Sequence, residues 1–91
     1  MMRDMTPEHC KAARFLLGWT LRDLAVESGV NRDTCNRFEL GRQVHTRTIR
    51  DIQRAFEDAG VRFQAPRRGR TMLPKVVLED GWQVVMHAPA R

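Results

Sequence analysis

Residues 20–41 read "TLRDLAVESGVNRDTCNRFELG" and contain two short helix-forming segments joined by a glycine-containing turn. In the second segment Asn31 can serve as the N-cap, and Gly41 is placed to end the helix. Helical spacing gathers apolar residues on one side: Val30, Cys35 and Phe38. The opposite side carries polar side chains at four positions: Arg32, Asp33, Asn36 and Arg37. The stretch therefore predicts an amphipathic helix over residues 31–40, whose polar face is either solvated surface or a recognition surface.

Three further helices are predicted around this one. Each runs from a threonine that can act as N-cap to a glycine that can end the helix, at residues 6–18, 20–29 and 46–60. Pro7 follows the first of these threonines, at the helical position where proline is best tolerated. Apolar residues recur at helical spacing within each segment. Four short helices with short connections predict a compact all-α unit over about the first two thirds of the chain.

The last third of the chain has a different character. "VRFQ" at residues 61–64 predicts a short extended segment, and "APRRGRTMLP" at residues 65–74 predicts a basic linker bounded by prolines. The stretch "KVVLEDGWQVVMH" at residues 75–87 has two β-branched runs around Asp80 and Gly81. This pattern predicts a hairpin with a two-residue type I′ turn, in which Val77 lies opposite Val84.

In that register both faces of the hairpin are apolar. One face carries Trp82, Val84, Val77 and Met86, and the other carries Leu78, Val76 and Val85. An isolated hairpin of this kind is not stable in water. We therefore expect it to pack on the helices, to pair with a second copy of the chain, or to bind a different protein.

Composition fits a small folded protein with an anionic partner. The 91 residues suffice for one small domain. The net charge is +5 and the isoelectric point about 10.6. Arginine supplies 14 of the 16 basic residues, which favours bidentate contacts to phosphate or guanine. This excess of positive charge suggests nucleic acid as the partner. There are two alternatives: many small basic proteins bind nothing acidic, and a GC-rich genome also raises the arginine content.

Other functional classes find little support in the sequence. Cys10 and Cys35 lie on predicted apolar helix faces, which favours buried thiols over a disulfide. The three histidines, His9, His45 and His87, lack metal-ligand spacing, so no metal and no cofactor is expected. The chain has no nucleophile-and-base motif and no glycine-rich phosphate loop, so it is not expected to be an enzyme. It has no membrane-spanning run and no secretory signal pattern, and we expect a cytoplasmic protein.

The two central helices resemble the helix-turn-helix of the lambda-repressor/Cro-like family, also called the xenobiotic-response-element type. The matching features are Leu24-Ala25, Gly29-Val30, Thr34, Cys35 and Glu39-x-Gly41. The resemblance extends from about Pro7 to Phe63 and leaves the tail unexplained. It implies a mainly α fold, with a DNA-binding domain at residues 1–65, a linker at 66–74 and a β-hairpin at 75–91. Leu21 departs from the family, which often has glutamine at that position.

The resemblance also implies roles for individual residues. In this family the second motif helix lies in the major groove of double-stranded DNA, and its base-reading positions match the polar face: Arg32, Asp33, Asn36 and Arg37. Asp33 has a second interpretation, because it could instead favour the helix N-terminus or orient Arg37. Phosphate contacts are expected from Thr20, Arg22, Arg42, Arg47 and Thr48. Arg14 matches a family arginine that pairs with the glutamate at Glu39.

These expectations lead to a functional hypothesis. The chain is predicted to be a transcriptional regulator, most simply a dimeric repressor that reads an inverted repeat with helix 31–40. The hairpin is the predicted dimer or partner interface, through Val77, Trp82, Val84 and Met86. The basic cluster of Arg67, Arg68 and Arg70 could reach a neighbouring phosphate or the minor groove. The alternative is an antitoxin-type interaction protein, whose helices bind operator DNA while the hairpin binds a protein partner.

Overall fold

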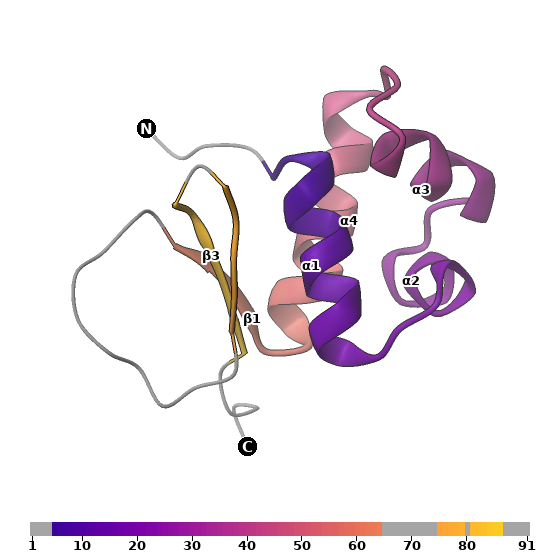
Figure 1. Ribbon diagram of the computed structural model, residues 1–91. Coiled ribbons are helices and arrows are strands. Elements are labelled where there is room, and N and C mark those ends of the chain that lie inside the picture. Colours follow the sequence, from indigo (N-terminus) through magenta and orange to yellow (C-terminus); the bar gives the residue numbers. More distant parts are fainter. Residues whose placement is uncertain (1–4, 65–74, 80, 87–91) are drawn as a thin grey trace.

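The computed structural model describes residues 5–64, 75–79 and 81–86, which form four helices followed by a three-stranded antiparallel sheet (Figure 1). The helices are α1 (Pro7–Leu17), α2 (Leu21–Ser28), α3 (Arg32–Glu39) and α4 (Thr46–Asp58). The strands are β1 (Val61–Gln64), β2 (Lys75–Val77) and β3 (Gln83–Met86). The fold is mainly helical, as the sequence predicts. The predicted basic linker, its arginine cluster, Asp80 and His87 lie outside the described residues.

The first two helices begin with reciprocal hydrogen bonds between side chain and backbone. The Thr6 hydroxyl accepts the backbone N–H of His9 at 3.2 Å, and His9 Nδ1 accepts the N–H of Thr6 at 3.0 Å. Thr20 and Asp23 make the same pair of bonds at the start of α2, at 3.1 and 2.9 Å. These capping boxes satisfy N–H groups that have no partner within the helix. The predicted threonine caps at these two helices are confirmed.

The ends of α3 and α4 follow the sequence with one exception. Asn31 caps α3 as predicted, because its Oδ1 accepts the N–H of Asp33 at 2.8 Å. Gly41 lies just beyond α3 and adopts a φ of 81°, in the left-handed region where glycine carries no penalty. The prediction that Thr46 caps α4 is wrong by one residue. The carbonyl of His45 accepts the first helical bonds, from Thr48 and Ile49, so His45 is the N-cap.

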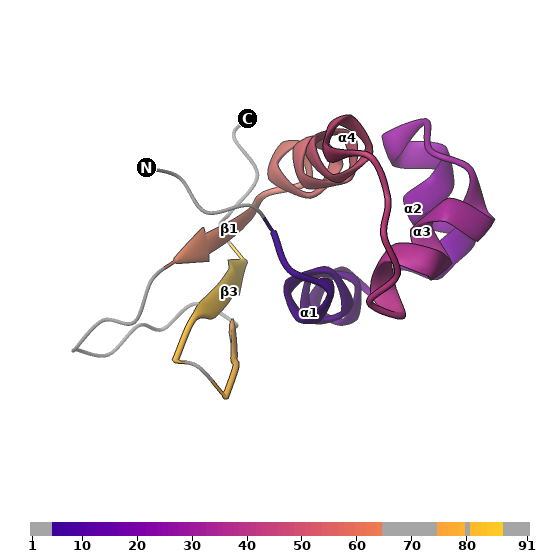
Figure 2. The same cartoon turned by 90° about the horizontal axis from the view of Figure 1, so that it is seen from above.

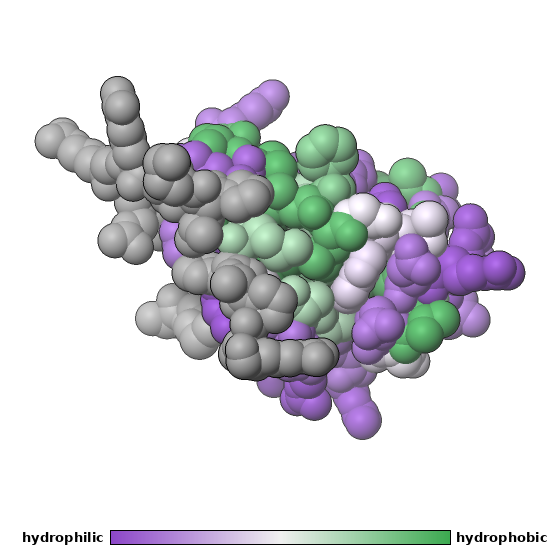
Figure 3. Space-filling view, turned by 90° about the horizontal axis from the view of Figure 1, so that it is seen from below, coloured by the Kyte–Doolittle hydropathy of each residue, from purple (hydrophilic) through white to green (hydrophobic). Residues whose placement is uncertain are grey.

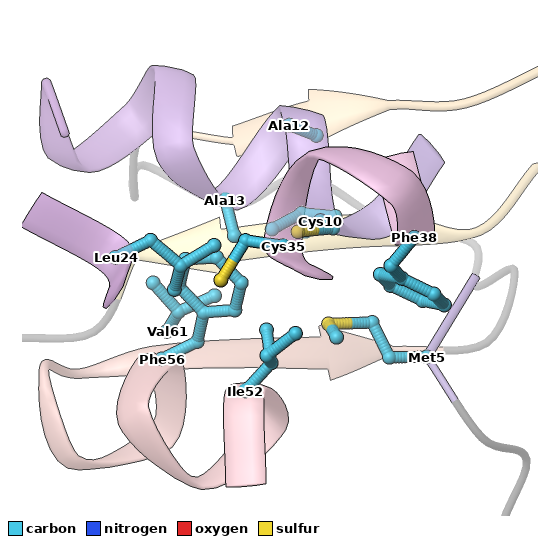
Figure 4. Close-up of a cluster of buried hydrophobic side chains, with 11 residues drawn as sticks. Met5, Cys10, Ala12, Ala13, Leu24, Cys35, Phe38, Ile52, Phe56 and Val61 are labelled. Carbon is cyan, nitrogen blue, oxygen red and sulfur yellow. The ribbon is translucent and has the colours of Figure 1, made fainter. Parts of the chain in front are cut away.

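The molecule has three layers, with α1 and α4 between the sheet and the pair formed by α2 and α3 (Figure 2). Toward α2 and α3, the side chains of Cys10 and Ala13 on α1 join a core with Leu24, Ile52 and Phe56 (Figure 4). Toward the sheet, α1 presents the buried ring of His9. Its centroid lies 5.6 Å from each of the rings of Phe63 and Trp82. The hydrophobic core therefore extends to both sides of α1.

The sheet has the order β1-β3-β2, and all of its pairs are antiparallel. The extended segment predicted at residues 61–64 is the strand β1. Its pairing with β3 makes β3 the central strand. The predicted hairpin register is wrong by one residue, since Val84 lies opposite Val76 and Val77 lies opposite Gln83.

The register is shifted because the hairpin loop has three residues, at positions 79–81. The N–H of Leu78 donates to the carbonyl of Trp82 at 2.8 Å, and the N–H of Gly81 donates to the carbonyl of Leu78 at 2.9 Å. Gly81 has a φ of 88°. A three-residue hairpin loop commonly ends with a residue in this left-handed conformation.

The shifted register changes which side chains share a face of the hairpin. Val84 is fully buried in the core, and Trp82 and Met86 lie on its side of β3, half-buried. Val77 was predicted to lie with them, but it lies on the other face and is 55% exposed. Packing on the chain's own helices, one of the three alternatives, therefore accounts for the inner face. Three of the four predicted interface residues belong to that inner face, and only Val77 is directed outward.

Candidate nucleic-acid interface

The polar face of α3 is held outward by the packing of its opposite side. Three residues, at positions 29–31, join α2 to α3, and Gly29 turns the chain with a φ of 73°. Cys35 and Phe38 anchor α3 in the core, where both are buried. The Cys35 thiol also donates to the carbonyl of Val30, at 3.8 Å. The helix is therefore fixed by one side, and the other side is left for solvent or a ligand.

The four residues predicted as base readers are all exposed on α3. Their predicted common orientation away from the core is confirmed. Arg32 Nη1 lies 3.8 Å from Asp33 Oδ1, and the two side chains are 61% and 88% exposed. A surface pair at this distance contributes little to stability and leaves both groups available. Asp33 thus pairs with Arg32 in this structure, rather than with Arg37 one turn further on.

A salt bridge fixes the C-terminal end of α3 to α1. Arg14 donates from Nε to Glu39 Oε2 at 2.6 Å and from its Nη2 to Oε1 at 2.8 Å. Its remaining nitrogen, Nη1, donates to the carbonyl of Trp19 at 3.0 Å. Glu39 is 5% exposed. The predicted Arg14–Glu39 pair is confirmed, and its two parallel hydrogen bonds define the orientation of α3 more closely than a single contact would.

The Glu39 carboxylate also receives a third hydrogen bond, from the thiol of Cys10 at 3.1 Å. Burial raises the pKa of Cys10, and the negative charge of Glu39 raises it further, so this thiol stays neutral. The hydrogen bond to Glu39 raises the pKa of Arg14, which keeps its positive charge. Burial is also the main reason that the pKa of Cys35 is raised. Both cysteines are free and buried, as the sequence predicts.

A surface hollow of about 390 Å³ lies between α3 and the start of α4. It is lined by Thr34, Arg37, Gln43, Val44, His45 and Thr48. The hollow brings one predicted base reader, Arg37, together with one predicted phosphate contact, Thr48. The first turn of α4 begins here, and His45 makes no side-chain capping bond to it. Backbone N–H groups in a first helical turn favour anions when no side chain occupies them.

The other predicted phosphate contacts are distributed around the same end of the molecule. Thr20 and Arg22 lie at the start of α2, Arg42 lies in the loop after α3, and Arg47 lies in the first turn of α4. All four are exposed, whereas Thr48 is half-buried in the hollow. The Thr20 hydroxyl already accepts the N–H of Asp23, and it can still donate its own proton to a phosphate oxygen. Hydrophilic side chains gather over the end formed by α2 and α3 (Figure 3).

The structure adds residues that the sequence analysis did not assign. Gln43 and His45 line the hollow because the loop between α3 and α4 folds back beside α3. Arg50 and Arg54 are exposed on α4, on the same side as Arg47. A signal for the arginines was present, since the three recur at intervals of three and four residues. No such signal exists for Gln43 and His45, whose positions depend on the path of the loop.

Comparison with known protein families and with curated proteins found no match to this chain. Among the described helices, none has both the length and the apolar content that a membrane crossing needs. Within the same part of the chain, no three histidine, cysteine or acidic side chains are grouped as metal ligands would be. The arrangement of the exposed polar and basic residues is therefore the basis for assigning a function.

Proposed function

We propose that this protein is a sequence-specific DNA-binding transcriptional regulator of the lambda-repressor/Cro-like kind, with α3 as its recognition helix. The observation that carries the proposal is the division of α3 into two sides. Cys35, Phe38 and Glu39 hold the helix on the protein, and four polar side chains project from the other side. A recognition helix needs this combination, because base contacts require a fixed helix that presents hydrogen-bonding groups to the major groove.

Each side chain on the polar face could form hydrogen bonds with a DNA base that suits its chemistry. Arg32 and Arg37 can each donate two hydrogen bonds to O6 and N7 of guanine, and Asn36 can pair with N6 and N7 of adenine. Asp33 can accept from N4 of cytosine, or it can remain paired with Arg32. The backbone of the same duplex would then lie against the hollow, where Thr48 and the start of α4 offer phosphate contacts.

Dimerisation would place two copies of α3 one turn of the duplex apart, which a single small domain needs for selective binding. Strand β2 lies at an edge of the sheet, so its outer backbone groups have no strand beside them among the described residues. Val77 on this strand is the one exposed large apolar side chain in the described part of the sheet. We assign the dimer contact to the β2 edge and to Val77 beside it, with a second copy of this chain as the occupant. On the same face, Gln83 and Val85 of β3 are already buried within one copy.

The test is selection of binding sites from a pool of randomised duplexes at two salt concentrations. Wild-type protein is compared with Arg32→Ala and Arg37→Ala, with Lys11→Ala as the control because Lys11 is exposed on α1 and is not among the predicted DNA contacts. We expect an inverted repeat, and each α3 variant should relax the preference at one position at a cost of about 1–3 kcal/mol. Lys11→Ala should select the same repeat as wild type. The proposal fails if no sequence is enriched and binding disappears as salt rises.

A further inference from the structure

We propose that the solvent side of α4 is a second contact surface for duplex DNA, which holds the DNA flanking the sequence that α3 reads. This inference rests on the proposed function and extends it to residues outside the recognition helix. The surface consists of Arg47, Arg50 and Arg54, and we call it the α4 arginine stripe.

The stripe follows from the helical spacing of the three arginines. Positions i, i+3 and i+7 lie on one side of a helix. Here that side is opposite the core face of α4, which is formed by the fully buried Ile52 and Phe56. All three arginines are exposed. At 1.5 Å per residue, the stripe is about 10 Å long, which matches the rise of about three phosphates along one strand of a duplex.

Among the described residues, the guanidinium groups of the stripe make no salt bridge. In the described part of the chain, none of its three guanidinium groups lies within ion-pair distance of a carboxylate, although Asp51 and Asp58 are on the same helix. Arg14 differs, because Glu39 balances its charge. Arg62 keeps its charge as well, but its Nη1 already donates to the carbonyls of Glu57 and Val61. The stripe therefore keeps three positive charges for an external anion.

The stripe continues from the hollow beside α3. Arg47 lies in the first turn of α4, next to His45 and Thr48, which line that hollow. From this point Arg50 and Arg54 follow the helix away from α3. A duplex that is held at the hollow and curves toward α4 would place the phosphates of its flank along the stripe. DNA is bent in this way by many proteins that bind it.

The chemistry of the stripe favours a duplex over other polyanions. The exposed large apolar residues of the described chain are Phe15, Val26, Leu40 and Val77, and none of them is on α4. A protein partner would need an apolar centre to its interface, and a single strand would need aromatic side chains on which its bases could stack. Three arginines without such neighbours suit the phosphates of a duplex, which are bound by charge and hydrogen bonds alone.

The experiment measures the salt dependence of binding on two duplexes, with wild type and the double variant Arg50→Gln/Arg54→Gln. One duplex ends at the selected site, and the other extends it by about one helical turn on each side. We expect the double variant to reduce the slope of log K against log salt by about 2 on the long duplex, because about one counterion is released for each phosphate contact. On the short duplex its slope should equal that of wild type.

Two controls keep the interpretation clear. Lys11→Gln removes a positive charge from the exposed face of α1 and should leave both slopes unchanged. Circular dichroism should be unchanged in the double variant, because both substitutions are at exposed helix positions. Arg47 is kept in all variants, because it belongs to the predicted phosphate contacts.

Three results would overturn the inference. An unchanged slope on the long duplex would mean that the stripe does not touch DNA, and would favour an acidic protein as its partner. An equal reduction on both duplexes would place Arg50 and Arg54 within the main footprint and not on the flank. A reduction with Lys11→Gln as large as with the double variant would reveal only a general charge effect. If wild type has no sequence preference, the proposed function fails. A smaller salt slope for the double variant than for wild type on the long duplex would then still show that the stripe contacts DNA, and equal slopes would overturn the inference.

Discussion

Glu39 is the residue on which the position of α3 depends most directly. Its carboxylate accepts two hydrogen bonds from Arg14 and one from Cys10, at a site that is almost completely buried. Arg14 is also needed at the turn after α1, where it donates to the carbonyl of Trp19. Removing the charge of Glu39 would leave a partly buried guanidinium without its counterion, which costs more than the pair itself contributes.

We therefore expect Glu39→Gln to destabilise the protein by about 2–4 kcal/mol, because one member of a buried pair is neutralised. Urea unfolding at pH 7 measures this as a lower midpoint with an unchanged slope. Asp33→Asn is the matched control, since that carboxylate is 88% exposed and should change stability by less than about 0.5 kcal/mol. Equal midpoints for Glu39→Gln and wild type would contradict this account of how α3 is held.

At the scale of elements, the helices could be predicted because their signals are local. A threonine or asparagine cap, a helical apolar repeat and a terminal glycine all lie within one segment, and they agree at α1, α2 and α3. The polar face of α3 could be predicted for the same reason. At α4 the capping signal is Thr46, but the cap is its neighbour His45, whose backbone carbonyl accepts the first helical bonds although its side chain makes no capping bond.

The sheet could be predicted only in part, because its pairings are not local. A glycine at position 81 suits a two-residue loop and a three-residue loop equally well. A shift of the pairing by one residue exchanges the two faces of a strand. Because valines are present on both faces here, such a shift still buries apolar side chains, and the apolar pattern does not select the register. The pairing of β1 with β3 joins segments about twenty residues apart, and nothing in "VRFQ" indicates its partner. The hollow beside α3 was missed for a similar reason, since the loop that carries Gln43 and His45 has no regular pattern.

Gly81 is the residue of the hairpin loop whose backbone lies in the left-handed region. With a φ of 88° at this position, Gly81→Ala should destabilise the protein by about 1–2 kcal/mol, because a Cβ in left-handed backbone approaches the following carbonyl. Gly81→Asn should cost less, because asparagine tolerates this conformation better. Thermal unfolding of the two variants and wild type measures the difference. Equal losses for alanine and asparagine would argue against a left-handed residue at this loop position.

At the scale of the whole molecule, the sheet is a layer of the fold as well as the proposed site of dimerisation. Substitutions on its two faces should therefore have different effects. A charge at Val84 would be placed in the core and would unfold the chain, so it cannot report on a dimer. A charge at Val77 meets solvent in a single copy and would be buried only where a second copy covers that face.

Accordingly, we expect Val77→Glu to convert a dimer into a folded monomer. Sedimentation measures the change in mass, and circular dichroism should show the helical content of wild type. Val26→Glu is the control, because Val26 is also an exposed valine but lies on α2, outside the sheet. It should leave the mass of a dimer unchanged. A Val77→Glu protein that still sediments as a dimer would move the interface away from this face.

The separation of the two sides of α3 has a consequence for how such a protein could change over time. The side chains that hold the helix, Cys35, Phe38 and Glu39, are distinct from those that it displays. New residues at the displayed positions would not disturb the core, so one scaffold can carry many different displayed surfaces at nearly constant stability. Substitutions at the displayed positions could therefore accumulate without loss of the fold. For the same reason, the binding specificity of α3 could be changed by design while the rest of the protein is kept.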